Sequence, residues 1–367
     1  MNGTRICAAD RIFTGGDWLN NNAVVISDGW IDRLVPVSSL EPGISIENFA
    51  GCLIAPAFID LQIYGAKQKL LSVYPEADSL EKLKEYCYEG GAAYCLPTVA
   101  TNTSDVFYRS IDAIRDYWAN KGDGILGLHI EGPWINVAKR GAHMESLIHA
   151  PDINEVHHLL EYGKGVIKMI TLAPEVCSKE VIDLIRSQQV IISAGHSNAT
   201  YRQSIDGFSN GIAIATHLYN AMSPLQHREP GLVGAVMNDE RVACSVIADG
   251  YHVNYEAIRI AKKIMGERLF AITDAVTETD KGPYQHQLAG DKYEAGGILS
   301  GSALTMNKAL KNLVNNVGVS PEEALRMCSL YPAKVMGLDN QLGQIKNGHK
   351  AKLVVLDDKM NLVKMIA

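Results

Sequence analysis

Short apolar runs alternate with longer amphipathic segments through the middle of the chain. The runs cover residues 53–62, 92–98, 124–131, 166–171, 190–196, 212–217, 243–249 and 269–274. The intervening segments are predicted to be helices, for example residues 104–120, 178–188 and 254–265, the last with Asn254 as its N-cap and Gly266 just past its end. Eight strand–helix units predict an α/β fold of the (β/α)8 TIM-like barrel type.

The two ends of the chain have a different pattern, in which short strands are separated by glycine-containing turns. Residues 1–52 and residues 339–367 share this character. Because chain termini often lie close together, we expect both ends to form one small β-sandwich domain, with residues 53–338 forming the barrel. A doubly wound sheet is the alternative fold, but the glycines of residues 296–302 do not form the GxGxxG phosphate turn.

Composition indicates a globular protein and argues against two classes of partner. Of the 367 residues, 47% are hydrophobic and 20% charged, which is ordinary for a globular domain. The formal net charge is −7 and no long basic run occurs, so nucleic acid is not expected as a partner. No apolar run approaches the roughly 18 residues of a membrane helix, and no secretion signal is recognised. Seven scattered cysteines without a CxxC motif predict buried thiols in a reducing cytoplasm.

Several of the predicted strands end in a polar or reactive side chain. Glu131, His196, His217 and Asp274 end four separate apolar runs. Because strand C-termini form the active-site face of such a barrel, we expect these side chains to meet at its mouth. Glu131, His196 and His217 are of the types that form a three-ligand catalytic zinc site, and a carboxylate such as Asp274 can act there as general base. Taken alone, His196 and His217 are also explained as hydrogen-bonded core histidines, and Glu131 as a helix N-cap.

Longer motifs add a resemblance to a known family. They are LHIEGPWIN with KRGAH just after it, TLAPE (171–175), SAGHSNAT (193–200), THLYNAMSPLQHREPGLVGA (216–235), ITDA (272–275), LSGSALTM (299–306) and RMCSLYPAKVMGL (326–338). Together they resemble the N-acetylglucosamine-6-phosphate deacetylases, a family of the amidohydrolase superfamily of metal-dependent barrel enzymes. The resemblance extends from about Pro56 to the end of the chain, and residues 216–231 are its most family-specific part.

The resemblance implies a catalytic centre. Glu131, His196 and His217 would bind one divalent metal ion per chain, expected to be zinc. Asp274 would be the general base and then the general acid. His143 would lie against the N-acetyl carbonyl or a sugar hydroxyl and help to polarise the amide.

The resemblance also implies a phosphate site and an assembly. Asn220 and Ala221 would offer backbone N–H groups to the phosphate of an amino-sugar phosphate, and His252 would add a side-chain contact. Arg228 would reach the phosphate bound by the neighbouring subunit of a homodimer, a role that suits the geometry of a guanidinium.

The chain departs from the superfamily pattern at the first barrel strand. Many amidohydrolases carry His-x-His there, whereas this chain has Gln62 and Tyr64. The modified lysine that often ends strand four has no counterpart either, because that strand ends in Ala173-Pro174 and Lys168 lies too early. Gln62 is a poor zinc ligand but can hydrogen-bond a water beside the metal. One metal ion per chain is therefore expected, with Gln62 next to it.

The predicted reaction is removal of the acetyl group from N-acetylglucosamine 6-phosphate, which gives glucosamine 6-phosphate and acetate. The N-acetylgalactosamine 6-phosphate epimer is a close alternative, because the orientation of one hydroxyl is not readable from the sequence. A cyclic amidohydrolase is disfavoured by the missing His-x-His and lysine. A barrel that only binds sugar phosphates is disfavoured because it would have no need of Asp274 as a base.

Overall fold

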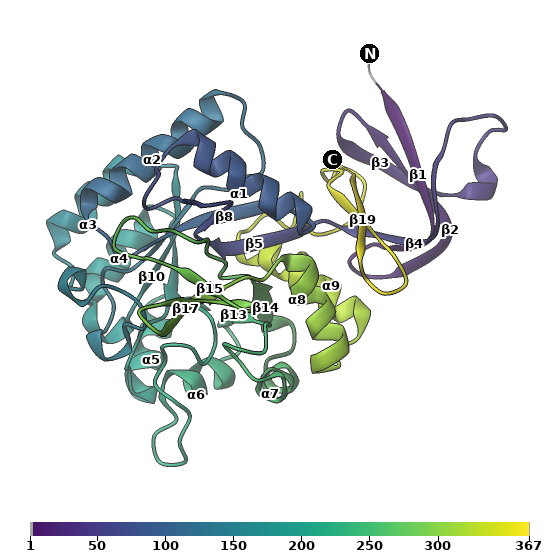
Figure 1. Cartoon of the computed structure of the whole chain (residues 1–367). Coiled ribbons are helices and arrows are strands. Elements are labelled where there is room, and N and C mark those ends of the chain that lie inside the picture. Colours follow the sequence, from purple (N-terminus) through teal and green to yellow (C-terminus); the bar gives the residue numbers. More distant parts are fainter. Residues whose placement is uncertain (1–2, 367) are drawn as a thin grey trace.

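The computed structural model describes residues 3–366 and divides them into a barrel and a smaller sheet domain (Figure 1). Eight parallel strands form the barrel and neighbour one another in chain order. They are β5 Phe58–Ile63, β8 Ala92–Ala100, β9 Leu128–Glu131, β10 Ile167–Leu172, β11 Ile191–Ala194, β12 Ile214–Ala215, β13 Ala243–Ile247 and β14 Leu269–Ile272. The N–H of Asp274 donates to Gln62 O and the N–H of Tyr64 donates to Ala275 O, each over 2.9 Å, which closes the sheet. The predicted barrel is confirmed.

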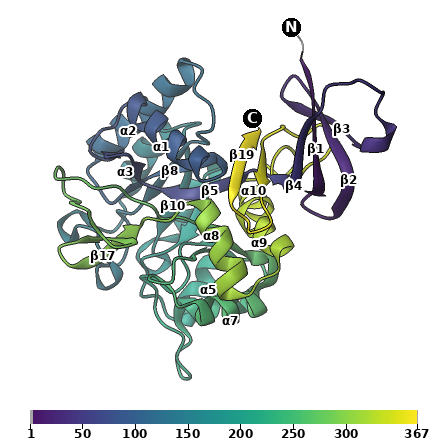
Figure 2. The same cartoon turned by 45° about the vertical axis from the view of Figure 1, so that its right-hand side comes forward.

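A helix follows each barrel strand and packs on the outside of the barrel (Figures 1 and 2). The helices are α1 Ala77–Glu89, α2 Ser104–Ala119, α3 Ile153–Tyr162, α4 Lys179–Ser187, α5 Tyr201–Ser209, α6 Gly231–Asn238, α7 Tyr255–Met265 and α8 Met306–Asn312, followed by α9 Pro321–Cys328 and α10 Leu330–Val335. In α7, Asn254 accepts the N–H of Glu256 over 2.8 Å, and Gly266 ends the helix at φ 56°. No helix within residues 3–366 is long and apolar enough to span a membrane.

Both chain ends join in one sheet beside the barrel, as Figure 2 shows. Its order is β19-β18-β4-β1-β2-β3, with bounds β1 Thr4–Phe13, β2 Trp18–Ser27, β3 Trp30–Pro36, β4 Glu47–Pro56, β18 Leu353–Leu356 and β19 Leu362–Ile366. One apolar cluster gathers side chains from all six strands, so this single sheet encloses the core of the small domain. The expected boundary after residue 52 falls inside β4, and residues 1, 2 and 367 of the expected domain lie outside the described part.

Two small antiparallel segments are inserted after the first and the last barrel strands. The first is the hairpin β6 Gly65–Ala66 and β7 Lys69–Leu70. The second is a three-stranded sheet, β15 Gln287–Ala289, β16 Lys292–Ala295 and β17 Ile298–Ser302. The sequence pattern did not predict this sheet, in which Leu299, Ser300 and Gly301 line the cavity at the barrel mouth. The second insertion therefore supplies one wall of the site.

Candidate metal centre and active site

Three of the predicted site residues occupy the same position relative to their strands. His196, His217 and Asp274 each come two residues after the end of β11, β12 and β14. Their φ angles are positive, at 47°, 40° and 54°, which is uncommon for a residue other than glycine. Such backbone costs on the order of 1–3 kcal/mol per residue and is concentrated at functional sites. Glu131 is the last residue of β9, so all four side chains belong to the C-terminal face of the barrel.

Glu131, His196 and His217 meet at the centre of this face. Oε1 of Glu131 lies 3.1 Å from Nε2 of His217 and 3.3 Å from Nε2 of His196. The two Nε2 atoms are 3.1 Å apart, and all three side chains are buried. One donor atom from each of three strand ends therefore faces a common point, as the sequence predicted.

The protonation of these groups fits a cation at that point. Nδ1 of His196 lies 3.0 Å from the carbonyl oxygen of Lys139 and can donate its proton there, which makes Nε2 the ring nitrogen available to a metal ion. Burial lowers the pKa of His196 to about 4, which keeps its imidazole neutral. Burial alone would raise the pKa of Glu131, but His196, His143 and His217 outweigh it and hold that pKa well below the usual range. Burial would lower the pKa of His217, but the hydrogen bond and charge of Glu131 outweigh it and raise that pKa. Two imidazole nitrogens and an ionised carboxylate form a donor set that suits zinc.

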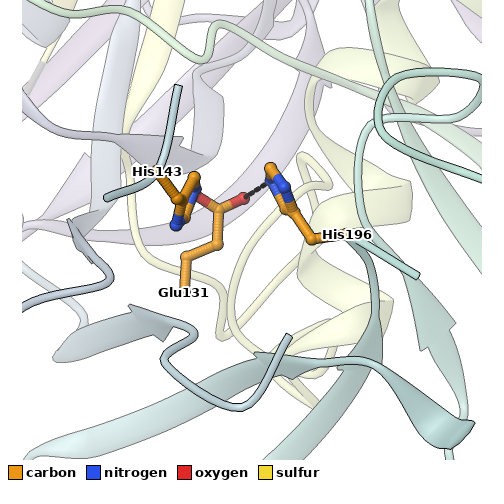
Figure 3. Close-up of side chains that lie close together, drawn as sticks. All are labelled: Glu131, His143 and His196. Atoms are coloured by element: carbon orange, nitrogen blue, oxygen red, sulfur yellow. Dashed lines mark ion pairs between the residues drawn. The ribbon is translucent and has the colours of Figure 1, made fainter. Parts of the chain in front are cut away.

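His143 lies beside the same carboxylate (Figure 3), and its ring centroid is 4.3 Å from that of His196. Its Nε2 lies 3.2 Å from Oε2 of Glu131, and its Nδ1 lies 2.7 Å from Oγ1 of Thr101. The ligand atoms of Glu131, His143 and His196 all lie within 4.8 Å of one another. His143 is therefore close enough to serve as a further metal ligand or to contact a substrate atom beside the metal. Thr101, which holds its ring, was not identified from the sequence.

Gln62 and Tyr64 occupy the positions of the missing His-x-His. Nε2 of Gln62 donates to Oε1 of Glu131 over 3.0 Å and to Oδ1 of Asp274 over 2.8 Å. The hydroxyl of Tyr64 donates to Oε2 of Glu131 over 2.5 Å and lies 3.3 Å from Oδ1 of Asp274. Burial raises the pKa of Asp274 above its ordinary value, although His217 opposes this. Two hydrogen-bond donors thus join the two carboxylates, and the sequence had assigned no role to Tyr64.

A layer of polar side chains lies beneath these groups inside the barrel. His129 is fully buried two residues before Glu131. Its Nε2 lies 2.7 Å from Oγ1 of Thr171, which lies 2.8 Å from Oγ1 of Thr216. Its Nδ1 lies 3.3 Å from Oγ1 of Thr98, and burial lowers the pKa of His129 to about 4. The network ties β8, β9, β10 and the end of β12 together. The sequence indicates the position of His129, because it lies two residues before Glu131 and residues two apart point to the same side of a strand.

A cavity of about 210 Å³ lies over Glu131, His196 and His217 and reaches Asn220, Ala221 and His252. The N–H of Asn220 donates to His217 O over 2.9 Å, so this group, expected at the phosphate, is engaged within the chain. Nδ1 of His252 lies 2.6 Å from Oδ2 of Asp249, which leaves Nε2 for a ligand. Burial would raise the pKa of Asp249, but the hydrogen bond from His252 holds it below its ordinary value.

Arg228 lies away from the other site residues. It is exposed in the loop of residues 216–230 between β12 and α6, which projects below α5 and α6 in Figure 1. Among the residues the structure describes, the lining of the 210 Å³ cavity does not include it. The chain by itself does not bring Arg228 to its own metal centre.

Comparison with known proteins covers almost the whole chain. The Amidohydrolase family matches residues 53–367 and the NagA composite domain matches residues 9–54. An N-acetylglucosamine-6-phosphate deacetylase of Haemophilus influenzae is 33% identical over 363 residues, which is 96% of this chain and 95% of the relative. An N-acetylgalactosamine-6-phosphate deacetylase of Escherichia coli O157:H7 is 32% identical over 371 residues, 98% of this chain and 97% of the relative.

Solved structures show the same fold over the same length. The crystal structure of N-acetylglucosamine-6-phosphate deacetylase from Pasteurella multocida superposes with a TM-score of 0.95 at 32% identity, covering 100% of this chain and 98% of the other. A mutant of N-acetyl-D-glucosamine-6-phosphate deacetylase from Mycobacterium smegmatis, in complex with N-acetyl-D-glucosamine-6-phosphate, gives 0.90 at 26% identity, covering 99% and 98%. With a metal-ligand cluster at the mouth of a matching barrel, the chain belongs to the amidohydrolase family.

Proposed function

We propose that this protein is a metal-dependent hydrolase that removes the acetyl group from N-acetylglucosamine 6-phosphate, releasing acetate and glucosamine 6-phosphate. The observation that carries the proposal is the meeting of Glu131, His196 and His217 beside Asp274. Relatives named for this activity match over nearly the full chain, which supports the choice of substrate.

One divalent metal ion, zinc by its donor set, would be held by Glu131, His196 and His217. When bound, the ion supplies a Lewis acid that polarises the acyl carbonyl and acidifies a neighbouring water. Gln62 and Tyr64 take the place of the ligands that a second ion would need. We therefore assign one metal ion to each chain.

The remaining chemistry falls to side chains around the ligands. Asp274 takes a proton from the attacking water and later delivers it to the leaving amine nitrogen. The amide of Gln62, 2.8 Å from Oδ1, holds that carboxylate in one orientation. Nε2 of His143 donates to the acyl carbonyl oxygen as negative charge develops there, while Thr101 fixes the ring through Nδ1.

The far end of the cavity is assigned to the 6-phosphate. Nε2 of His252, the side-chain amide of Asn220 and the N–H of Ala221 are the groups we place against it, since all three residues line the cavity. Arg228 would complete this site from the second subunit of a homodimer, because it is exposed and distant from its own cavity.

All seven cysteines are free, which supports a reducing cytoplasm as the compartment.

Acetate release by the purified, metal-loaded protein tests the proposal. N-acetylglucosamine 6-phosphate should be hydrolysed with a much higher kcat/KM than unphosphorylated N-acetylglucosamine, because the binding energy of the remote phosphate is lost in the latter. N-acetylgalactosamine 6-phosphate is the matched comparison, and a higher kcat/KM on it would assign the enzyme to that epimer. Absence of acetate release from both phosphates would overturn the proposed function.

A further inference from the structure

A second, smaller cavity of about 40 Å³ adjoins the 210 Å³ cavity at the metal centre. The two share one edge, formed by Tyr64, Glu131, Ala142, His143 and Ser300. The side pocket therefore opens at the place where the acyl carbonyl has to lie for hydrolysis. Nothing in the reaction described above uses it.

The interior of this side pocket is largely apolar and uncharged. Beyond the shared edge it is lined by the apolar residues Leu70, Ala100 and Val276, and by the polar residues Ser72, Tyr284 and His286. The hydroxyl of Tyr284 donates to Thr101 O over 2.5 Å, and Nδ1 of His286 lies 2.8 Å from Oγ of Ser300. Because the hydroxyl of Tyr284 and Nδ1 of His286 already have partners within the chain, and Leu70, Ala100 and Val276 supply apolar surface, the pocket suits an apolar group better than a charge.

The geometry of an amide decides which substrate group points into the pocket. The acyl carbon carries an oxygen, a nitrogen bonded to the sugar, and a methyl group. The sugar extends towards Asn220, Ala221 and His252, which line the main cavity and not the side pocket. With the carbonyl oxygen towards His143 and the ligands, the methyl group is directed past Tyr64 and away from the sugar.

We propose that this side pocket holds the methyl group of the acetyl substituent and sets the length of acyl chain that the enzyme accepts, an inference that rests on the proposed function. One water molecule takes up about 30 Å³ in the liquid, so 40 Å³ is comparable with a single methyl-sized group and leaves little room for a longer chain. One methylene in an apolar pocket is worth about 10- to 200-fold in discrimination. The kcat/KM should fall by that order for each methylene added beyond the capacity of the pocket.

The test compares N-acetyl, N-propionyl and N-butanoyl glucosamine 6-phosphate, with the common amine product measured for all three. Val276→Ala enlarges only the side pocket and should lower the acetyl-to-butanoyl ratio of kcat/KM by at least about tenfold. Val276→Ile narrows the pocket and should raise the acetyl-to-propionyl ratio. Leu299→Ala is the matched control, because Leu299 lines the main cavity and not the side pocket; its ratios should equal those of the wild type.

Two results would overturn the inference. One is an unchanged acyl-chain profile in both Val276 variants, when circular dichroism and thermal melting show that they are folded. The other is an equal change of profile in Leu299→Ala, which would mean that chain length is sensed by the main cavity. Each comparison is a ratio of kcat/KM values for two substrates of the same variant, so it tests the side pocket and not the proposed function. The proposed function fails only if the wild-type protein does not hydrolyse the acetyl substrate at all.

Discussion

The Tyr64→Phe substitution removes a single atom, the phenolic oxygen, from the group of hydrogen bonds around Glu131. That hydroxyl donates to Oε2 of Glu131 over 2.5 Å, whereas Oε1 faces His196 and His217. In the proposed site, Oε1 would therefore bind the metal, and Tyr64 holds the other oxygen of the same carboxylate. Since Glu131 is only 1% exposed, bulk water does not replace the lost donor.

The expected size of the effect follows from the remaining contacts. A hydrogen bond to a charged group contributes about 1.5–3 kcal/mol, and about 1.4 kcal/mol corresponds to a tenfold change in a dissociation constant. Loss of a partner that orients a ligand typically weakens metal binding by about 10- to 100-fold. Nε2 of His143 still lies 3.2 Å from Oε2 in the variant, so we expect the Kd for zinc to rise by about tenfold.

Zinc affinity is measured by competition with a chromophoric chelator, which needs no substrate and no turnover. Tyr284→Phe is the matched control, since its hydroxyl also lies in the side pocket but donates to Thr101 O and not to Glu131. The control should bind zinc with wild-type affinity. A wild-type Kd in Tyr64→Phe, or the same loss in Tyr284→Phe, would refute the role given to the Tyr64 hydroxyl.

The other predictions address catalysis, metal binding, assembly and stability. Asp274→Asn should lower kcat by about 10²- to 10⁴-fold and keep its metal; near-normal kcat would remove Asp274 from the mechanism. His196→Ala should lose tightly bound metal in elemental analysis, and wild-type content would contradict its assignment as a ligand. The Arg228→Ala and Asp274→Asn variants, unfolded and refolded together, should recover roughly a quarter of wild-type activity at subsaturating substrate. About half of the dimers are then mixed, and each mixed dimer has one intact site of two, the one that keeps Asp274 and receives Arg228 from the other subunit. Activity no higher than the average of the two variants would mean that Arg228 acts in its own subunit or not at all. Asn254→Ala removes the N-cap of α7 and should lower the free energy of unfolding by about 0.5–2 kcal/mol. In denaturant unfolding, the midpoint should fall while the dependence of the free energy on denaturant concentration stays the same. An unchanged midpoint would contradict this prediction.

The sequence by itself determined the barrel and the positions of its main chemical groups. Apolar runs and amphipathic segments report on one element at a time, and their regular alternation leaves few possible folds. His196, His217 and Asp274 were found because each ends such a run, and the ends of parallel strands meet on one face. The replacement of His-x-His by Gln62 and Tyr64 was also predictable from the sequence, because it depends only on which residues occupy these two positions.

Short, weakly patterned elements were missed. The strands β15, β16 and β17 have three to five residues each and are mostly exposed or half-buried, so no alternation of apolar and polar positions marks them. The small domain was predicted as a β-sandwich formed by both chain ends, and its six strands form a single sheet. The predicted boundary after residue 52 falls inside β4, because one continuous apolar run, residues 53–62, contains the end of β4 and nearly all of β5.

Only the tertiary structure decided which side chains touch. Tyr64 meets Glu131, 67 positions away, and Asp274, 210 positions away, because closure of the barrel brings β5 beside β14. The contact of His143 with Thr101 and the side pocket between Leu70, Ala100 and Val276 arise in the same way, from residues at or beyond the ends of different barrel strands. Periodicity in a sequence specifies which face of its own element a residue occupies, but the distance between two such faces is set by how all eight strands pack.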